Sequence, residues 1–349
     1  MNQRVDAGFG DRIKLNTRID REFSEFTYPI LAIGYPFLVN LDVKAVHVEP
    51  RESEELADIT RERGWDLHFD QIDSGKFGGY GDFWPLLRKR CSRFAIKRTV
   101  YIHGITPTNL FTFLIPERRE DAVGFNGQKV TPDTICILTP GDEAALYLPA
   151  NHMMTACCFE QTLLEETLHE VGSTTPLKTI VPHTALLALP PDVVAPLRQL
   201  LETAPSTCPT RFVEEDVFTG ICLALAESRG RPHRTPLASR NYRRYVRKVR
   251  GYLEDRRLAE ALSLQTLCQI TGVGARTLNT AFQEITGDSP MQFIKRRRLN
   301  AARHALSTDE AESVKGAALD HGFWHLGRFA DEYRNLFGER PSETLSRAS

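Results

Sequence analysis

The sequence predicts an α+β protein of two domains, the first rich in β-strands and the second built only of helices. Short apolar and aromatic segments between residues 65 and 160 alternate with Gly, Pro, Asn and Asp, a pattern typical of a β-sandwich or small barrel. The last hundred residues instead show apolar spacings of three and four, and one helical pattern occurs there twice. A length of 349 residues is ordinary for two domains.

The first domain is expected to span residues 1–227. After the strands, residues 162–171, a segment opened by Pro190-Pro191, and residues 211–229 have helical spacing. The last of these helices carries an apolar stripe that includes Phe212, Val217 and Ile221. Such a stripe suits either packing on the strands of the same chain or pairing with a second copy through residues 210–228.

Aromatic side chains cluster in one glycine-rich stretch of the strand region. Small-molecule pockets are mostly apolar with a few polar groups, so this cluster is a candidate binding site, and the same aromatics would serve equally well as core. The residues are Phe77, Tyr80, Phe83 and Trp84.

No motif in the chain indicates an enzyme. G-x-S-x-G, H-E-x-x-H, Walker-type and H-x-H patterns are missing, and His103, His152 and His183 are scattered, so we expect no catalytic residues, metal or cofactor. The seven cysteines form no C-x-x-C and are expected to be reduced thiols of a cytoplasmic protein, with the adjacent Cys157 and Cys158 on opposite faces of a strand. No apolar run of about 18 residues occurs, which excludes a predicted transmembrane helix, and the first residues lack the apolar core of a signal peptide.

A linker is expected between the domains. Residues 228–240 are rich in Ser, Pro, Gly and Arg and have no apolar period. Beyond them the charge balance changes: residues 240–349 hold 19 Lys and Arg against 13 Asp and Glu, whereas the rest of the chain holds 25 against 32. A basic C-terminal part beside an acidic N-terminal part is typical of a DNA-binding module joined to another domain.

The second domain, residues 241–349, contains two helix-turn-helix patterns. In the second pattern a short helix leads to Gly322, and a longer helix with apolar residues at Leu326, Phe329, Tyr333 and Phe337 follows. An upstream segment has the same skeleton, with its aromatic, Gly and Pro positions each offset by 51 residues. Such a repeat indicates a duplicated unit, and the second helix of a helix-turn-helix enters the DNA major groove.

These segments resemble a known family. GFWHLGRFADEYRNLFGERPSETL is similar to the signature of the AraC/XylS family of bacterial transcription regulators. The segment from Leu264 to Leu306 resembles the first helix-turn-helix of that family and its central linking helix, and the match covers roughly residues 242–345. Within the family, NYRRYVRKVRGYL and GFWHLGRFA are most similar to the regulator of the ethanolamine-utilisation operon.

The resemblance implies a cupin-like β-barrel that binds a small-molecule effector, a homodimer, and activation of transcription with RNA polymerase as a partner. It also implies binding to double-stranded DNA and no association with membranes. On the first pattern, Leu278, Ala281, Phe282 and Ile285 should be buried. The opposite face carries residue types suited to reading bases, although the same pattern would fit a solvated helix face. The candidate DNA contacts are Arg276, Thr277, Asn279, Thr280, Gln283, Lys295, Arg296, Arg297, His325, Arg328 and Asp331.

Two other functions are weighed against this one. A cupin-type enzyme with a helical appendage would contain a bound metal or show turnover. A DNA-repair fusion would need a reactive cysteine in a P-C-H-R type motif, which the sequence does not contain.

Overall fold

The structure, a computed structural model, describes most of the chain beyond residue 45. The described residues are 46–85, 89–116, 123–131, 134–189, 194–199, 211–227, 237–254, 262–308 and 310–348. Val43–Ser349 cluster into one compact unit. The predicted linker up to residue 236 and the side chain of Trp84 lie outside the described residues.

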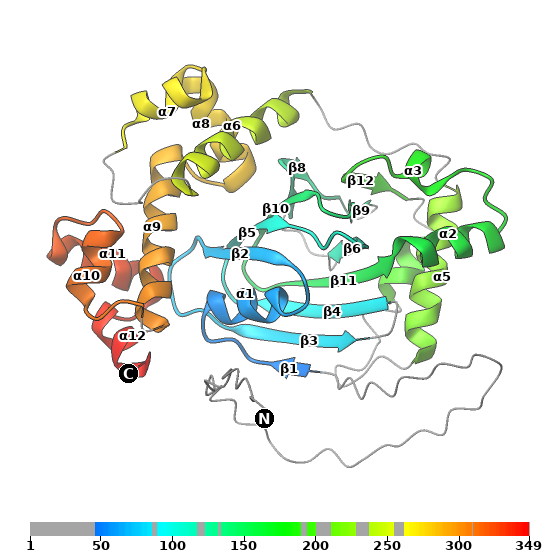
Figure 1. Cartoon of the computed structure of the whole chain (residues 1–349), viewed down its shortest axis with the longest axis horizontal. Coiled ribbons are helices and arrows are strands. Elements are labelled where there is room, and N and C mark those ends of the chain that lie inside the picture. The colour runs from blue at the N-terminus through cyan, green and yellow to red at the C-terminus, as the bar shows by residue number, and fades with distance from the viewer. Residues whose placement is uncertain are drawn as a thin grey trace, which may run out of the picture. The chain divides into compact units, whose positions relative to one another are not determined.

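The strands of the first half form two antiparallel sheets (Figure 1). The larger sheet contains, in spatial order, β1 (Val46–Val48), β3 (Gly79–Pro85), β4 (Lys89–Ile96), β11 (His152–Glu160), β6 (Leu110–Pro116), β9 (Thr134–Leu138) and β12 (Ala185–Ala188). The smaller sheet contains β2 (Asp66–Gln71), β5 (Val100–Ile105), β10 (Glu143–Leu148), β7 (Gly124–Phe125) and β8 (Gln128–Lys129).

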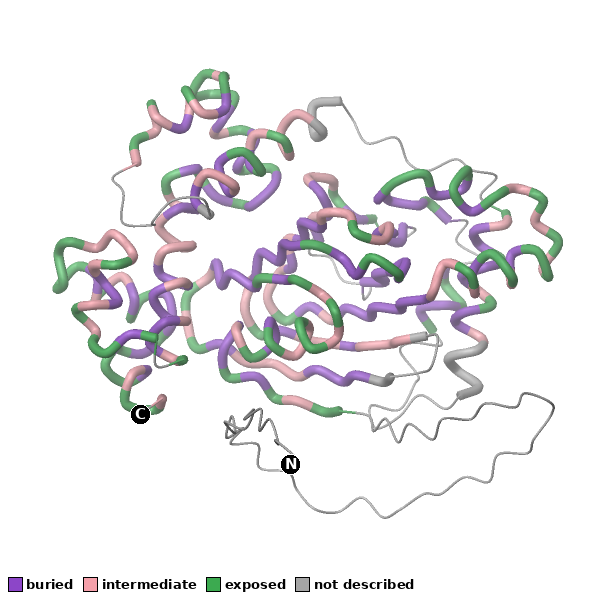
Figure 2. The backbone as a smooth tube through the Cα atoms, viewed as in Figure 1, coloured by how far each residue is buried: buried purple, intermediate pink, exposed green. Residues whose placement is uncertain are grey.

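An apolar core lies between the two sheets. Phe69 and Ile102 of the smaller sheet pack in one cluster with Leu114 and Met154 of the larger one. Figure 2 shows buried stretches, in purple, along the strands of both sheets. Successive residues of a strand face opposite sides, so a strand that borders this core supplies it with every second side chain, as Leu67 and Phe69 of β2 do. The facing sheets match the predicted cupin-like layout, although the described strands do not close into one barrel.

A second core covers the outer side of the larger sheet. The helices α2 (Gln161–Glu170), α3 (Leu177–Ile180) and α5 (Arg211–Glu227) contribute to it. Phe218 of α5 packs on Phe159 of β11 with 4.7 Å between ring centroids, and Val217 and Ile221 are buried beside it. The described part of the α5 stripe therefore packs within the chain, which is one of its two predicted uses. Cys157 faces this core, whereas Cys158 accepts a hydrogen bond from Thr112.

The C-terminal part is all helical, as predicted. Its helices are α6 (Leu237–Glu254), α7 (Leu264–Thr271), α8 (Ala275–Thr286), α9 (Pro290–Ser307), α10 (Val314–Asp320), α11 (Leu326–Phe337) and α12 (Pro341–Ala348). Because α6 begins at Leu237, the end of the range predicted as linker is helical, a correction that follows from its continuation into the apolar positions Val246, Val249 and Leu253. Within the described residues no helix is long and apolar enough to cross a membrane.

The predicted duplication is visible in the helix ends. Gly287 after α8 and Gly338 after α11 both take left-handed backbone angles, with φ of 76° and 73°. Ser263 and Ser313 cap α7 and α10 in the same way, each accepting a hydrogen bond from a backbone N–H three residues later. Equivalent caps at equivalent places confirm that one helical unit occurs twice.

The helices pack directly on the outer face of the smaller sheet. Ile72, Tyr101 and Ala145 share a buried cluster with Phe282 and Phe293 of the first helix-turn-helix unit. The second unit has its own core around α9, α10 and α11. The β-rich part and the helical part therefore pack against each other through buried side chains.

Candidate nucleic-acid interface

The first candidate reading helix is α8, which follows the αL turn at Gly272 and the cap residue Gly274. The apolar side of α8 is buried as predicted, and this fixes its opposite side toward solvent. Arg276, Thr277, Thr280 and Gln283 are exposed and Asn279 is half-buried. The side chains of Asn279, Thr280 and Gln283 also donate to nearby backbone carbonyls at 2.8, 3.1 and 2.9 Å.

The second candidate reading helix is α11, with His325 as its N-cap residue. Phe329, Tyr333, Leu336 and Phe337 point into the protein, so the opposite side of the helix is free. His325, Arg328 and Asp331 lie there and are exposed.

Glu332, an acidic residue on α11 and thus an unfavourable neighbour for phosphate, is largely neutralised. Arg328 Nε donates to its carboxylate at 3.1 Å, and Lys295 Nζ of α9 lies 3.4 Å from the same oxygen. Two cations on one carboxylate leave one positive charge, which the neighbouring exposed Asp331 balances. Lys295 thereby connects the linking helix to the second unit.

The basic run on α9 does not form one phosphate-binding face. A helix turns by about 100° per residue, so consecutive arginines point in different directions. Arg296 makes a bidentate contact with Asp288 at 2.6 Å, and Arg297 reaches Asp70 at 3.1 Å and His103 Nε2 at 2.6 Å. This corrects the expectation for Arg297, which is only 14% exposed and is directed into the protein.

Asp70, His103 and Arg297 form a buried polar cluster between β2, β5 and α9. Burial alone raises the pKa of Asp70, but Arg297 and His103 outweigh it and bring that pKa below its ordinary value. Burial, together with Arg250 and Arg297, holds the pKa of His103 well below its ordinary value. The imidazole is therefore neutral at pH 7, and its Nε2 lies 2.6 Å from the guanidinium of Arg297 and 3.2 Å from the carboxylate of Asp70.

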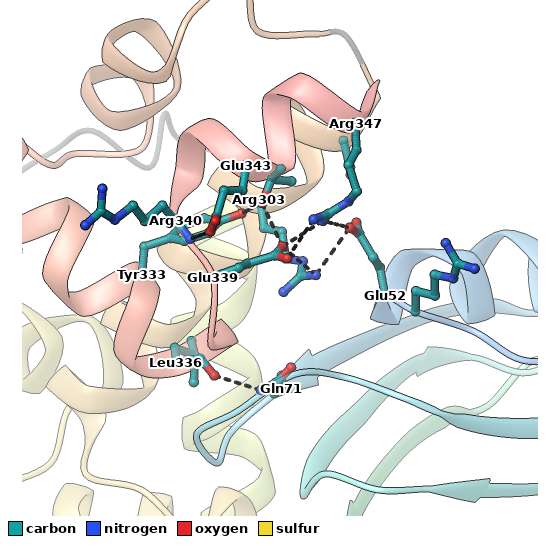
Figure 3. A network of polar contacts seen from close by, with 12 residues as sticks. Glu52, Gln71, Arg303, Tyr333, Leu336, Glu339, Arg340, Glu343 and Arg347 are labelled. Atoms are coloured by element: carbon teal, nitrogen blue, oxygen red, sulfur yellow. Dashed lines mark hydrogen bonds and ion pairs between the residues drawn. The ribbon is translucent and has the colours of Figure 1, made fainter. Parts of the chain in front are cut away.

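A second polar network joins the N-terminal half to the second helix-turn-helix unit (Figure 3). Arg303 of α9 lies 3.2 Å from Glu52 and 3.1 Å from Glu339, and Arg347 of α12 lies 3.0 Å from Glu52. In addition, the side-chain amide of Gln71 donates to the carbonyl of Leu336 at 2.9 Å. The last turn of α11 is thus fastened to the end of β2.

A reciprocal pair of hydrogen bonds reinforces this connection. Asn300 of α9 accepts from the backbone N–H of Gln71 at 3.1 Å and donates to its carbonyl at 3.2 Å. Both groups are buried, and a buried amide that lost these partners would be costly.

The structure does not bring the predicted effector residues together. Phe77 is buried in the core between the sheets. Tyr80 and Phe83 lie an odd number of positions apart on β3 and so face opposite sides. Tyr80 donates to the sulfur of Met153, whereas the guanidinium of Arg63 lies over the ring of Phe83 at 4.6 Å. In the described part of the chain, no three His, Cys, Asp or Glu side chains gather as metal ligands would.

The surface at the start of α11 also holds two residues absent from the predicted contacts. Trp324 is 65% exposed and Leu326 is 40% exposed. The sequence predicts Leu326 in the apolar stripe of this helix, and the structure corrects this, because Leu326 is the first residue of α11 and is exposed. Trp324 does not fit the spacing of the apolar residues that α11 buries. This misfit is the feature of the sequence that could have identified it as a surface residue.

Comparison with known proteins identifies the helical part. Residues 267–347 match the family described as "Helix-turn-helix domain". The XylDLEGF operon transcriptional activator 2 of Pseudomonas putida is 43% identical over 101 residues, which are 28% of this chain and 64% of that protein. The HTH-type transcriptional activator RhaS of Enterobacter sp. (strain 638) is 32% identical over 98 residues, which are 28% of this chain and 34% of that protein.

A solved structure is similar to the same region. It is described as a probable AraC family transcriptional regulator from Rhodopseudomonas palustris CGA009 and is 44% identical, covering 30% of this chain and 96% of that one with a TM-score of 0.28. The chain spans less than two thirds of the length of both activators named above. These sequence matches support the resemblance that the duplicated pattern indicated: residues 267–347 match a helix-turn-helix domain and are similar to the corresponding part of transcription activators.

Proposed function

We propose that the protein is a sequence-specific DNA-binding transcription regulator and that it activates transcription. The observation that carries this proposal is the pair of helix-turn-helix units joined by the 18-residue helix α9. Both second helices, α8 and α11, bury their apolar sides and leave Arg276, Gln283, Arg328 and Asp331 exposed. Activation is the role named for the relatives in Pseudomonas and Enterobacter, and it carries over here as part of the proposal.

The finer parts of the proposal concern partners. The β-rich half, with residues 1–227 as its expected extent, would bind a small-molecule effector, and the helical part from residue 241 would bind duplex DNA and assist RNA polymerase. A homodimer in the cytoplasm fits this role. The similarity to the regulator of the ethanolamine-utilisation operon remains a prediction about which effector is bound, and a thermal-shift screen of small amines, amino acids and carboxylates would test it.

DNA binding can be tested directly with the full chain and the DNA upstream of its own gene. We expect sequence-selective binding whose affinity falls by at least roughly a hundredfold between 50 and 200 mM salt. Basic side chains that bind phosphates release counterions from the DNA, and this release is less favourable at higher salt. Fluorescence anisotropy with an unrelated duplex as competitor measures both properties. Binding that is insensitive to salt, or equal for both duplexes, would contradict the proposal.

A further inference from the structure

The start of α11 carries an apolar surface patch inside an otherwise polar reading surface. Trp324 and Leu326 are among the large hydrophobic side chains that the described residues leave exposed, at 65% and 40%. They flank His325, and the run continues through Gly327 and Arg328, all of them exposed. Five consecutive exposed residues, two of them large and apolar, indicate a surface that meets a partner.

Gly327 supports the same conclusion independently. It lies in the first turn of α11, where glycine destabilises a helix by about 1 kcal/mol relative to alanine. A Cβ placed on Gly327 would have no atom of a neighbouring element within 4 Å, and its φ is not in the left-handed region. Neither packing nor backbone conformation within the chain accounts for this glycine. A partner that approaches the helix closely would account for it.

The position of the patch indicates which partner this is. The first residues of the second helix in a helix-turn-helix contact base edges in the major groove. Arg328 lies on the same exposed run, and Asp331 follows Gly327 by one helical turn, so the patch continues the polar reading surface of α11. Duplex DNA bound at this surface would therefore cover the patch.

We propose that Trp324 and Leu326 recognise the 5-methyl group of thymine in the major groove, while Gly327 lets the DNA approach the helix. The thymine methyl is the apolar feature of a base edge in that groove, and apolar side chains contact it. This inference rests on the proposed DNA-binding function and assigns a base preference to its second unit. The operator therefore contains an A·T pair where α11 enters the groove.

Replacing thymine by deoxyuridine removes only this methyl group. In a footprinted operator, each thymine of the half contacted by the second unit is replaced in turn and the affinity of the full chain is measured by anisotropy. We expect one or two replacements to weaken binding about fourfold each, the effect of exposing one buried methyl. Leu326→Ala or Trp324→Ala should bind the thymine and deoxyuridine operators equally at those positions.

Gly327→Ala separates binding from folding. Alanine should raise the melting temperature by roughly 2 °C through higher helix propensity and should weaken operator binding at least about tenfold by blocking close approach. Gly251→Ala is the matched control, because Gly251 is also helical and a Cβ there would also have no neighbour within 4 Å. The control should gain the same stability and keep its affinity.

The outcomes distinguish this inference from the proposed function. If the wild type binds no duplex in a sequence-selective, salt-dependent way, the proposed function fails and the inference fails with it. If the wild type binds but every deoxyuridine operator is equivalent to its thymine parent, thymine recognition is overturned and the proposed function stands. If Gly327→Ala binds as tightly as Gly251→Ala, the close approach at α11 is overturned.

Discussion

Individual side chains on α8 determine how bases would be read. Arg276 and Asn279 suit bidentate contacts to guanine and adenine, each contributing about 1–3 kcal/mol of discrimination. Arg276→Ala should therefore weaken operator binding roughly tenfold or more and relax the preference at one base pair. The measurement is anisotropy with single-base operator variants. Lys178→Ala, which removes an exposed cation from α3, is the control and should change affinity little.

The buried His103 makes stability depend on pH. Its pKa is held well below its ordinary value of 6.5 in the folded state, first by burial. Below pH 6.5 the unfolded chain takes up a proton that the folded chain does not, so stability falls as the pH falls through that range. The melting temperature of His103→Gln should decline less than that of the wild type between pH 7 and pH 5.

Two neighbouring carboxyl groups change the stability at other pH values or with the opposite sign. The pKa of Asp70 is below its ordinary value, so the stability that the Asp70 carboxylate contributes is lost only below about pH 4. Burial, aided by the charges of Asp70 and Asp58, raises the pKa of Glu54 to about 8. The folded chain therefore holds a proton that the unfolded chain has lost, and stability falls as the pH rises toward 8. The difference between wild type and His103→Gln isolates the histidine, and parallel curves would show that it does not titrate as argued.

At the scale of helices, the glycine caps differ in what surrounds them. Gly272 and Gly287 both have φ near 75°, so alanine at either position should cost about 1 kcal/mol of stability from backbone strain. A Cβ on Gly287 would also lie 2.8 Å from the ring of Tyr147, whereas one on Gly272 has no such neighbour. Thermal melts should show Gly287→Ala to be clearly less stable than Gly272→Ala, and equal melting temperatures would exclude the contact with Tyr147.

The helical elements could be predicted from sequence because their signals are local. Glycines and apolar spacings of three and four predicted the helices of both helix-turn-helix patterns and the linking helix between them, and the offset between Phe282 and Tyr333 revealed the duplication. The direction of Arg297 could not be predicted, since it depends on Asp70 and His103, which are distant in sequence. Sheet order and the burial of Phe77 depend on such long-range contacts too.

At the scale of the molecule, the two halves are joined by the side-chain ion pair of Asp70 on β2 and Arg297 on α9, 3.1 Å apart. The changes Asp70→Ala and Arg297→Ala should therefore be coupled by about 0.5–3 kcal/mol in a double-mutant cycle of unfolding free energies. Urea unfolding of the wild type, both single variants and the double variant gives the coupling energy. Simple additivity would mean that β2 and α9 do not pack together in solution.

Within the smaller sheet, β5 lies between β2 and β10, and each of these outer neighbours touches the end of one reading helix. Gln71, the last residue of β2, donates from its side chain to the carbonyl of Leu336 in the last turn of α11, and Tyr147 of β10 lies against Gly287, the glycine that closes α8. A change in the twist of these three strands would therefore tilt α8 and α11 in concert. The spacing between the two proposed DNA contacts would then depend on a β-sheet that need not touch the nucleic acid at all.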